Sequence, residues 1–204
     1  MNRSPLAFVL TLCGIAAAGS PALVADAVFN FNSDTVGEAT NFTNTVNGIS
    51  ATFSSPLQGG FFVATNFLRP PMSGNILLDS GVAPDNNIPL FINFSTEISS
   101  IILDFGLETT KPGALFDMIA FNNGTEVGSA FATGGGPSFR QGTIGLGLPM
   151  FNEVELFTNS APAFAIDNVR VAGVTPEPAS MALFGLGGLG LMGISKLRRR
   201  YFRS

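Results

Sequence analysis

The chain has 204 residues, a formal net charge of −4 and only 12% charged residues. It contains no histidine, one cysteine and one tyrosine. Catalytic triads built on histidine and metal sites that need imidazole ligands are therefore excluded. The acidic balance also argues against a nucleic-acid partner, because a negatively charged surface repels phosphates.

Residues 1–27 have the pattern of an export signal. Arg3 supplies a positive start, residues 5–18 form a short apolar core, and the Ala-Asp-Ala segment at 25–27 offers small side chains for cleavage after residue 27. We therefore expect signal peptidase to act here and to remove Cys13 with the signal. Disulfides would then be unable to stabilise the mature chain.

The composition of the middle of the chain favours β-structure. The segment 28–175 contains four basic and twelve acidic residues, which gives it a net charge of −8, and it holds seventeen of the twenty phenylalanines. These lie among Ile, Val, Thr, Asn and Ser, with Gly, Pro or Asn-Gly every eight to twelve residues or so. Residues 28–172 are therefore predicted to form one all-β domain, an antiparallel β-sandwich of the jelly-roll type.

Alternation of apolar and polar residues locates the individual strands. In the first half they are expected at 28–31, 48–54, 61–63 and 76–78, with proline-containing loops at 69–74 and 82–87. In the second half they are expected at 90–94 and 98–105, paired through 95–97; at 115–121 and 126–132, joined by a turn at 122–125; and at 154–157 and 163–171. The glycine-punctuated stretch 139–148 is left unassigned.

The C-terminal residues form a linker, an apolar run and a basic end. The linker, 173–178, contains a Pro-Glu-Pro sequence, and 179–195 carries no charge. A helix of that length nearly spans the ~30 Å hydrocarbon core of a bilayer, so we expect a single transmembrane helix. Five of the ten basic residues lie in 196–204, which places this tail on the cytoplasmic side by the positive-inside rule.

This order of elements resembles the PEP-CTERM sorting signal of exported bacterial proteins. The residues that carry the resemblance are Pro176, Glu177, Pro178, Arg198, Arg199 and Arg200. The resemblance implies that an exosortase, a membrane-embedded cysteine protease or transpeptidase, removes the tail and that the domain is released or attached elsewhere. The alternative is an ordinary stop-transfer anchor, which does not need the Pro-Glu-Pro motif.

The strand layout also resembles jelly-roll sandwiches of PEP-CTERM proteins and of carbohydrate-binding modules with a galactose-binding-like fold, through the strings at 104–106, 151–156 and 164–169. The resemblance implies that an Asp on the final strand helps to hold a calcium ion. That role would fall to Asp167, with Asp34 or Glu38 as partners. The alternative for Asp167 is a turn or bulge residue that accepts hydrogen bonds from backbone amides.

Two further groups of side chains are candidates for function. Glu153 and Glu155 lie two apart on one expected strand, hence on one face and ~6–7 Å apart, which is compatible either with a glycosidase pair or with two solvated acids. Sugar-binding modules usually stack sugar rings on Trp or Tyr, which the domain lacks. The phenylalanines near loops that could substitute, or else pack in the core, are Phe61, Phe62, Phe67 and Phe139.

Three functions stay open from the sequence. The favoured one is an exported, non-catalytic surface or extracellular-matrix protein associated with exopolysaccharide. The others are a carbohydrate-binding module and a hydrolase that uses carboxylates alone. The expected partners are signal peptidase, an exosortase-type protease and extracellular polysaccharide, without nucleic acid, and calcium is the one candidate cofactor.

Overall fold

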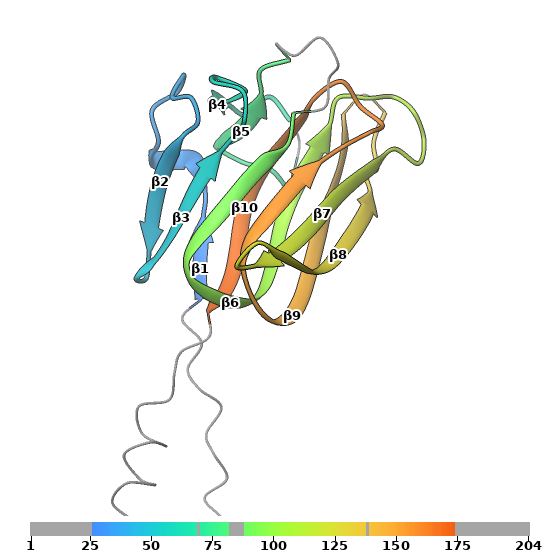
Figure 1. Cartoon of the computed structure of the whole chain (residues 1–204). Helices are drawn as coiled ribbons and strands as arrows, with labels where there is room; N and C mark the ends of the chain where they lie inside the picture. Colours follow the sequence, from blue (N-terminus) through green and yellow to red (C-terminus); the bar gives the residue numbers. More distant parts are fainter. Residues whose placement is uncertain (1–25, 69, 82–87, 138, 174–204) are drawn as a thin grey trace, which may run out of the picture. The chain divides into compact units, whose positions relative to one another are not determined.

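The computed structural model describes residues 26–68, 70–81, 88–137 and 139–173 (Figure 1). In these ranges the regular elements are antiparallel strands and one short 3-10 turn, η1 (Phe31–Ser33). The strands are β1 (Asp26–Phe29), β2 (Phe42–Val46), β3 (Ile49–Ser54), β4 (Phe61–Thr65), β5 (Asn75–Asp79), β6 (Leu90–Leu107), β7 (Leu115–Asn122), β8 (Thr125–Thr133), β9 (Arg140–Phe157) and β10 (Phe164–Gly173). The predicted all-β antiparallel sandwich is confirmed.

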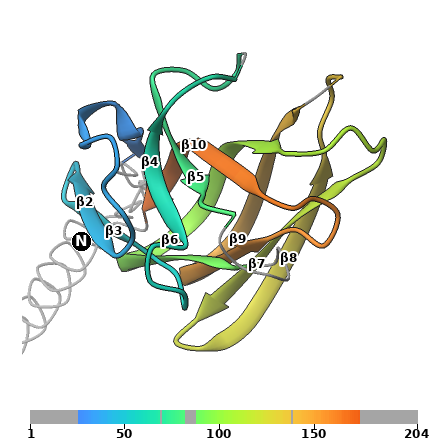
Figure 2. The same cartoon turned by 90° about the horizontal axis from the view of Figure 1, so that it is seen from above.

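The strands form two layers that share the two longest strands, β6 and β9. In the first layer β2 and β3 flank the beginning of β6, which pairs with the end of β9, followed by β7 and β8. In the second layer β4 pairs with β5, and β5 and β1 both pair with β10. β10 pairs with the rest of β6, and this part of β6 pairs with the beginning of β9. In Figure 2, β4, β5 and β10 lie on one side of the domain and β7 and β8 on the opposite side.

The shared strands pass between the layers where their pairing is irregular. The register of β6 against β9 shifts between Asn93 and Ile98 and again between Ile98 and Ser100. Such irregularities bend strands and let them turn the corner of a sandwich. The prediction that 90–94 and 98–105 pair with each other is therefore wrong. Residues 95–97 contain no Gly, Pro or Asn that would favour a tight turn, and the backbone continues as one strand.

Phenylalanine rings fill the space between the layers. One group joins the second layer to the first: Phe61 contacts Phe164 with ring centroids 5.0 Å apart, and Phe116 contacts Phe164 at 5.1 Å and Phe105 at 4.7 Å. A second group gathers around Phe53 at the other side of the core. The phenylalanines that predicted β-structure thus contribute eight of the twelve largest fully buried side chains.

Local turn chemistry is confirmed at the hairpin of β7 and β8. Asn123 and Gly124 have φ of 50° and 77°, a backbone conformation that Asn and Gly adopt at low cost. At the start of the domain, β1 begins before the expected cleavage point, since Ala27 is buried and pairs with Val171 of β10. The sequence analysis missed β2, because its Thr and Asn residues give only a weak apolar pattern.

A loop covers the outer face of the second layer. This loop follows β4, and we call its described residues, 66–68 and 70–74, the strap. Met72 of the strap is 1% exposed and packs with Ile76 and Ala165 in a small apolar cluster separate from the main core. A Cβ atom at Gly106 of β6 would lie only 2.9 Å from the Leu68 side chain, so glycine at this position lets the strap approach the sheet closely.

Candidate functional site

A buried polar network lies between the second layer and the strap. Asp104 on β6 and Asp167 on β10 are register partners, and both side chains are almost completely buried. Asp104 accepts hydrogen bonds from the Thr143 hydroxyl at 2.8 Å, from Arg170 at 2.9 Å and from the Asn168 amide at 3.1 Å. The Arg170 contact is an ion pair, with the arginine side chain 45% exposed. The network satisfies charges that the strap has removed from water.

Asp167 anchors the strap at a β-bulge. Its carboxylate accepts hydrogen bonds from the backbone amides of Ser73 in the strap (2.9 Å) and of Asn168 (2.7 Å), and Asn168 has φ of 48°. The pairing with β6 slips by one residue here, between Asp167 and Arg170. Burial raises the pKa of Asp167, while the two amides act in the opposite direction and Asp104 reinforces the rise. The contacts correspond to the bulge interpretation of this residue.

The structure does not place the other two predicted calcium ligands in this network. The Asp34 carboxylate accepts a hydrogen bond from Asn44 at 2.8 Å, and Glu38 is exposed with its backbone carbonyl bonded to Val63. Within the described ranges no group of three or more acidic, histidine or cysteine side chains is arranged to hold a metal ion. Calcium binding by Asp167 with Asp34 or Glu38 stays a prediction without support from these contacts.

Among the described residues, no loop comparable to the strap covers the outer face of the first layer. We call it the open face and define it by six outward side chains of β6, β7, β8 and β9: Phe91, Asp117, Phe131, Glu153, Glu155 and Phe157. Glu153 and Glu155 lie on this face as predicted, because the intervening Val154 is buried. Glu153 is the register partner of Phe121, and Glu155 is the partner of Ile119 on the same neighbouring strand.

Aromatic rings and carboxylates alternate across the open face. Phe131, Asp117 and Phe157 form one row over β8, β7 and β9, and Phe131 is 73% exposed. Partial burial raises the pKa of Asp117. Partial burial also raises the pKa of Glu155, and the neighbouring Glu153 raises it further. These carboxylates are thus incompletely hydrated, as expected for acids next to apolar side chains.

Hydroxyl groups continue the same outer surface onto β2 and β3. Thr43 and Thr52 share a hydrogen bond of 2.8 Å between their hydroxyls, and Thr45 and Ser50 share one of 2.7 Å. Each pair lies directly opposite in the register of the hairpin. Cross-strand pairs of this kind stabilise a sheet and leave a polar surface in contact with solvent.

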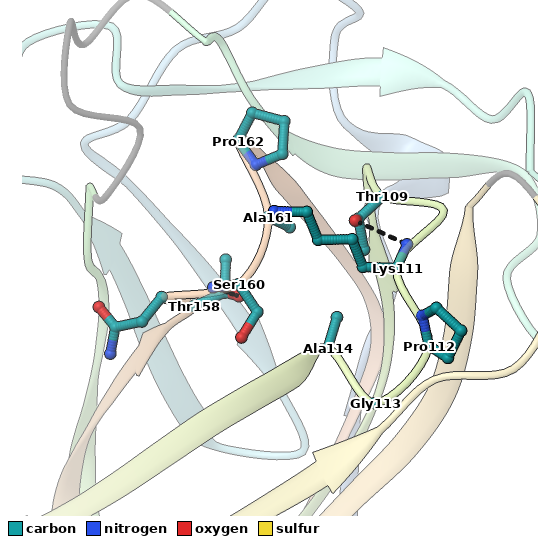
Figure 3. A pocket seen from close by; sticks show the side chains of 10 residues that line it. Thr109, Lys111, Pro112, Gly113, Ala114, Thr158, Ser160, Ala161 and Pro162 are labelled. Atoms are coloured by element: carbon teal, nitrogen blue, oxygen red, sulfur yellow. Dashed lines mark hydrogen bonds between the residues drawn. The ribbon is translucent and has the colours of Figure 1, made fainter.

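A pocket of about 620 Å³ lies at one end of the sandwich, between the β6–β7 and β9–β10 loops. Lys111 extends its side chain toward Ala161 in the view of Figure 3. The Thr158 hydroxyl donates a hydrogen bond to the Leu115 carbonyl at 2.7 Å and accepts one from the Ser160 amide at 3.2 Å, so this loop is held in place. The pocket offers one cation together with hydroxyl and amide groups to a small ligand.

The phenylalanines expected near loops have different environments. Phe61 is completely buried in the core, and Phe62 packs beside the small cluster under the strap. Phe67 is 57% exposed, with its ring 5.3 Å from that of Phe139. The sequence did not predict that Phe131 is exposed. Residues alternate between the two faces of β8, but the sequence does not show which of these faces is the inner one.

The sorting residues at 176–178 and 198–200 lie outside the described residues, but the C-terminal sequence is matched as a family. Residues 174–200 match the PEP-CTERM protein-sorting motif, which confirms the resemblance seen in the sequence. The motif implies export and membrane anchoring through the C-terminus. In the part of the chain that the structure describes, no helix has the length and apolar character needed to cross a bilayer, and the expected helix at 179–195 falls beyond that part.

No curated protein matches the chain. Among solved structures, the K2 cleaved adhesin domain of Lys-gingipain shares 16% identity over 72% of this chain and 97% of its own, with a TM-score of 0.46. The arabinose-bound MgGH51 α-L-arabinofuranosidase shares 11% identity over 75% of this chain and 27% of its own, with a TM-score of 0.48. This chain therefore spans about a quarter of that enzyme. CBM35 from Cellvibrio japonicus Abf62 shares 14% identity over 74% of this chain and 94% of its own, with a TM-score of 0.35. Likenesses at these identities and scores do not transfer a function.

Proposed function

We propose that this chain, which carries the PEP-CTERM sorting motif, is an exported, non-catalytic surface or extracellular-matrix protein that associates with exopolysaccharide. The observation that carries the proposal is the joining of the sorting motif at 174–200 to an acidic β-sandwich with a broad open face. The chain contains no histidine, so its acid–base chemistry would depend on carboxylates. The open face is suited to contact with an extended polymer.

The proposed route begins with export. Signal peptidase removes the N-terminal signal, the helix at 179–195 stops in the membrane, and the basic end at 196–204 remains inside. An exosortase-type protease then cleaves near the Pro-Glu-Pro motif and frees the sandwich. The acidic body supports this location, because its −8 charge keeps the domain soluble outside the cell and away from anionic polymers.

The intact mass of the protein recovered from the cell exterior tests this route. We expect a mass that lacks both the signal and the basic end. Glu177→Ala should retain the tail and keep the protein in the membrane fraction, whereas the matched control Glu126→Ala, an exposed acid on β8, should be processed normally. Recovery of an uncleaved chain from the cytosol would contradict the proposal.

The end pocket favours a second candidate, a carbohydrate-binding module that holds the end of a sugar chain. Its one cation, Lys111, and the hydroxyls of Thr109 and Ser160 are groups that bind sugar hydroxyls or a carboxylate. A glycan array on the processed protein distinguishes the candidates. Saturable binding that is weakened by Lys111→Ala and unchanged by Phe131→Ala would favour the module.

A hydrolase that uses Glu153 and Glu155 is the least supported candidate. The two acids share a face, but the pocket described above is lined by other residues and lies at the end of the sandwich. Glycosidases place their carboxyl groups on either side of the scissile bond. The assay is the release of reducing sugar from a polysaccharide by the native chain. If this activity is present and is lost in both Glu153→Gln and Glu155→Gln, the chain is a hydrolase and our proposal is wrong.

A further inference from the structure

The open face exposes apolar rings in a pattern that a partner would cover. Phe131 keeps 73% of its surface in water, and Phe157 lies two strands away with Asp117 between them. Neighbouring strands are ~4.8 Å apart, so the two phenylalanines are separated by ~10 Å. The next row continues from Ile119 through Glu155 to Phe91 on β6. The exposed rings make this surface more than a solvated polar face.

The charge of the open face has one sign. The strand segments that form it, 90–93, 115–122, 125–133 and 150–157, contain four acidic residues and no Lys or Arg. The single ion pair in the described part of the chain, between Arg170 and Asp104, lies on the other layer. Within the described residues the acids of the open face thus have no cationic side chain as a partner, and a cationic ligand would complement them.

From this complementarity we propose that the open face binds a linear polysaccharide of amino sugars with free ammonium groups, laid across strands β8, β7, β9 and β6. The rings of Phe131 and Phe157 cover the apolar faces of sugar rings, and Asp117 between them receives an ammonium group. Glu155 receives a second ammonium group in the next row. The inference rests on the proposed association with exopolysaccharide and names the class of polymer and the site.

The geometry disfavours two other occupants. A second copy of the chain would bring acids against acids, which is repulsive. An anionic polysaccharide would meet the three carboxylates of this face and is disfavoured for the same reason. The row from β8 to β3 spans four strand intervals, about 19 Å, which suits an extended chain better than a single sugar.

The test is calorimetric titration of the full chain, kept in solution with a polyoxyethylene detergent that has no sugar headgroup. The probes are a fully deacetylated glucosamine hexamer, its N-acetylated form, cellohexaose and hexalysine. We expect the deacetylated hexamer to bind at least tenfold more tightly than the other three, and its affinity to fall as salt is raised. Equal binding of either neutral hexamer, or of hexalysine, would overturn the proposal.

Variants place the binding on the open face. Phe131→Ala and Asp117→Asn should each weaken the deacetylated hexamer about fivefold to tenfold, which corresponds to ~1 kcal/mol. The matched controls are Phe67→Ala, an exposed phenylalanine on the strap, and Glu38→Gln, an exposed acid before β4, and these should leave the affinity unchanged. Thermal melts would show that all four variants are folded.

No binding by the folded chain, or equal losses in the controls, would overturn the inference. The proposed export is measured separately by intact mass. A protein that is correctly exported and processed but does not bind the amino-sugar hexamer would therefore overturn this inference and leave the proposed export unaffected.

Discussion

The two outer faces of the sandwich differ in the burial and hydrogen bonding of their carboxylates. On the second layer, the strap buries Asp104 and Asp167, and each carboxylate has protein donors within 3.1 Å. On the first layer, Asp117 and Glu155 stay partly exposed beside aromatic side chains. One face thus uses acids to hold the domain together, and the other presents them to solvent and to a partner.

The difference has a physical cause in the strap. A loop that covers a sheet must satisfy its own backbone groups, and the Ser73 amide finds its acceptor in Asp167. Once the strap is in place, any charge beneath it must be paired, which Arg170 and Asn168 achieve for Asp104. In the described ranges no loop covers the open face, so its acids need no such partners and can be changed with little effect on stability.

The sharpest test of this contrast is the removal of one acid from each face. Asp104→Ala should lower the free energy of unfolding by about 3 kcal/mol, because Thr143, Asn168 and Arg170 lose their common acceptor. Asp117→Ala should change it by less than about 0.5 kcal/mol. Urea unfolding of both variants gives the values, and equal effects would show that the two faces do not differ in this way.

Apolar side chains should show the same contrast. Met72→Ala in the strap, at a site 1% exposed, should lower the free energy of unfolding by about 2 kcal/mol, because it leaves a cavity. The loss stays at the low end of the usual range because the cluster is small and can relax around the cavity. Phe131→Ala on the open face should cost less than about 0.5 kcal/mol despite the loss of a larger side chain. Chemical denaturation is the measurement. A large loss in Phe131→Ala would mean that the open face is part of the core.

The dependence of stability on pH should come mainly from two buried acids, Asp167 under the strap and Asp79 at the end of β5. Burial raises the folded-state pKa of Asp167 and of Asp79 above the ordinary value of 3.8. The folded chain therefore holds these protons more tightly than the unfolded chain. Their stabilising effect is complete below pH ~4 and is lost as the pH rises through the raised pKa values.

We accordingly expect Tm to be higher in mild acid than at pH 7 by a few degrees. Asp167→Asn should flatten this dependence more than Asp117→Asn does, since the pKa of Asp117 is raised at a more exposed site. Calorimetric scans between pH 4 and pH 8 give both slopes. Identical flattening by the two variants would remove the distinction.

Calcium should have the smallest effect. Asp34 and Asp167 already accept hydrogen bonds from Asn44, Ser73 and Asn168, so a calcium ion would have to replace those donors. A rise in Tm with calcium that is lost in Asp34→Asn would support the predicted site. No heat on titration and no change in Tm would remove it.

Local sequence signals predicted local structure well. The hairpin at 122–125 was predictable because Asn123 and Gly124 favour positive φ whatever surrounds them. The strands with strict alternation, such as β3, were predictable for the same local reason. The single strand β6 was not, because polar residues at 95–97 look like a connection when the two layers that the strand joins are unknown.

The candidate sites depended on contacts that no local pattern reveals. The hydrogen bond from Ser73 to Asp167 joins residues 94 positions apart, and the role of Asp104 appears only when β6, β9 and β10 are side by side. The row of Phe131, Asp117 and Phe157 likewise combines three strands. The sequence predicted that Glu153 and Glu155 share a face, since both lie on one strand, but it did not predict their aromatic neighbours.

The pairing of β10 also determines how the domain bears mechanical load. The chain leaves the domain after Gly173, at the end of a strand flanked by β6 along most of its length and by β1 and β5 on the other edge. A force applied between the open face and the C-terminal end of the domain would act along β10. We expect this geometry to load all hydrogen bonds of β10 at the same time, in shear. The domain should then resist tension far better than it would if the force broke these bonds one after another.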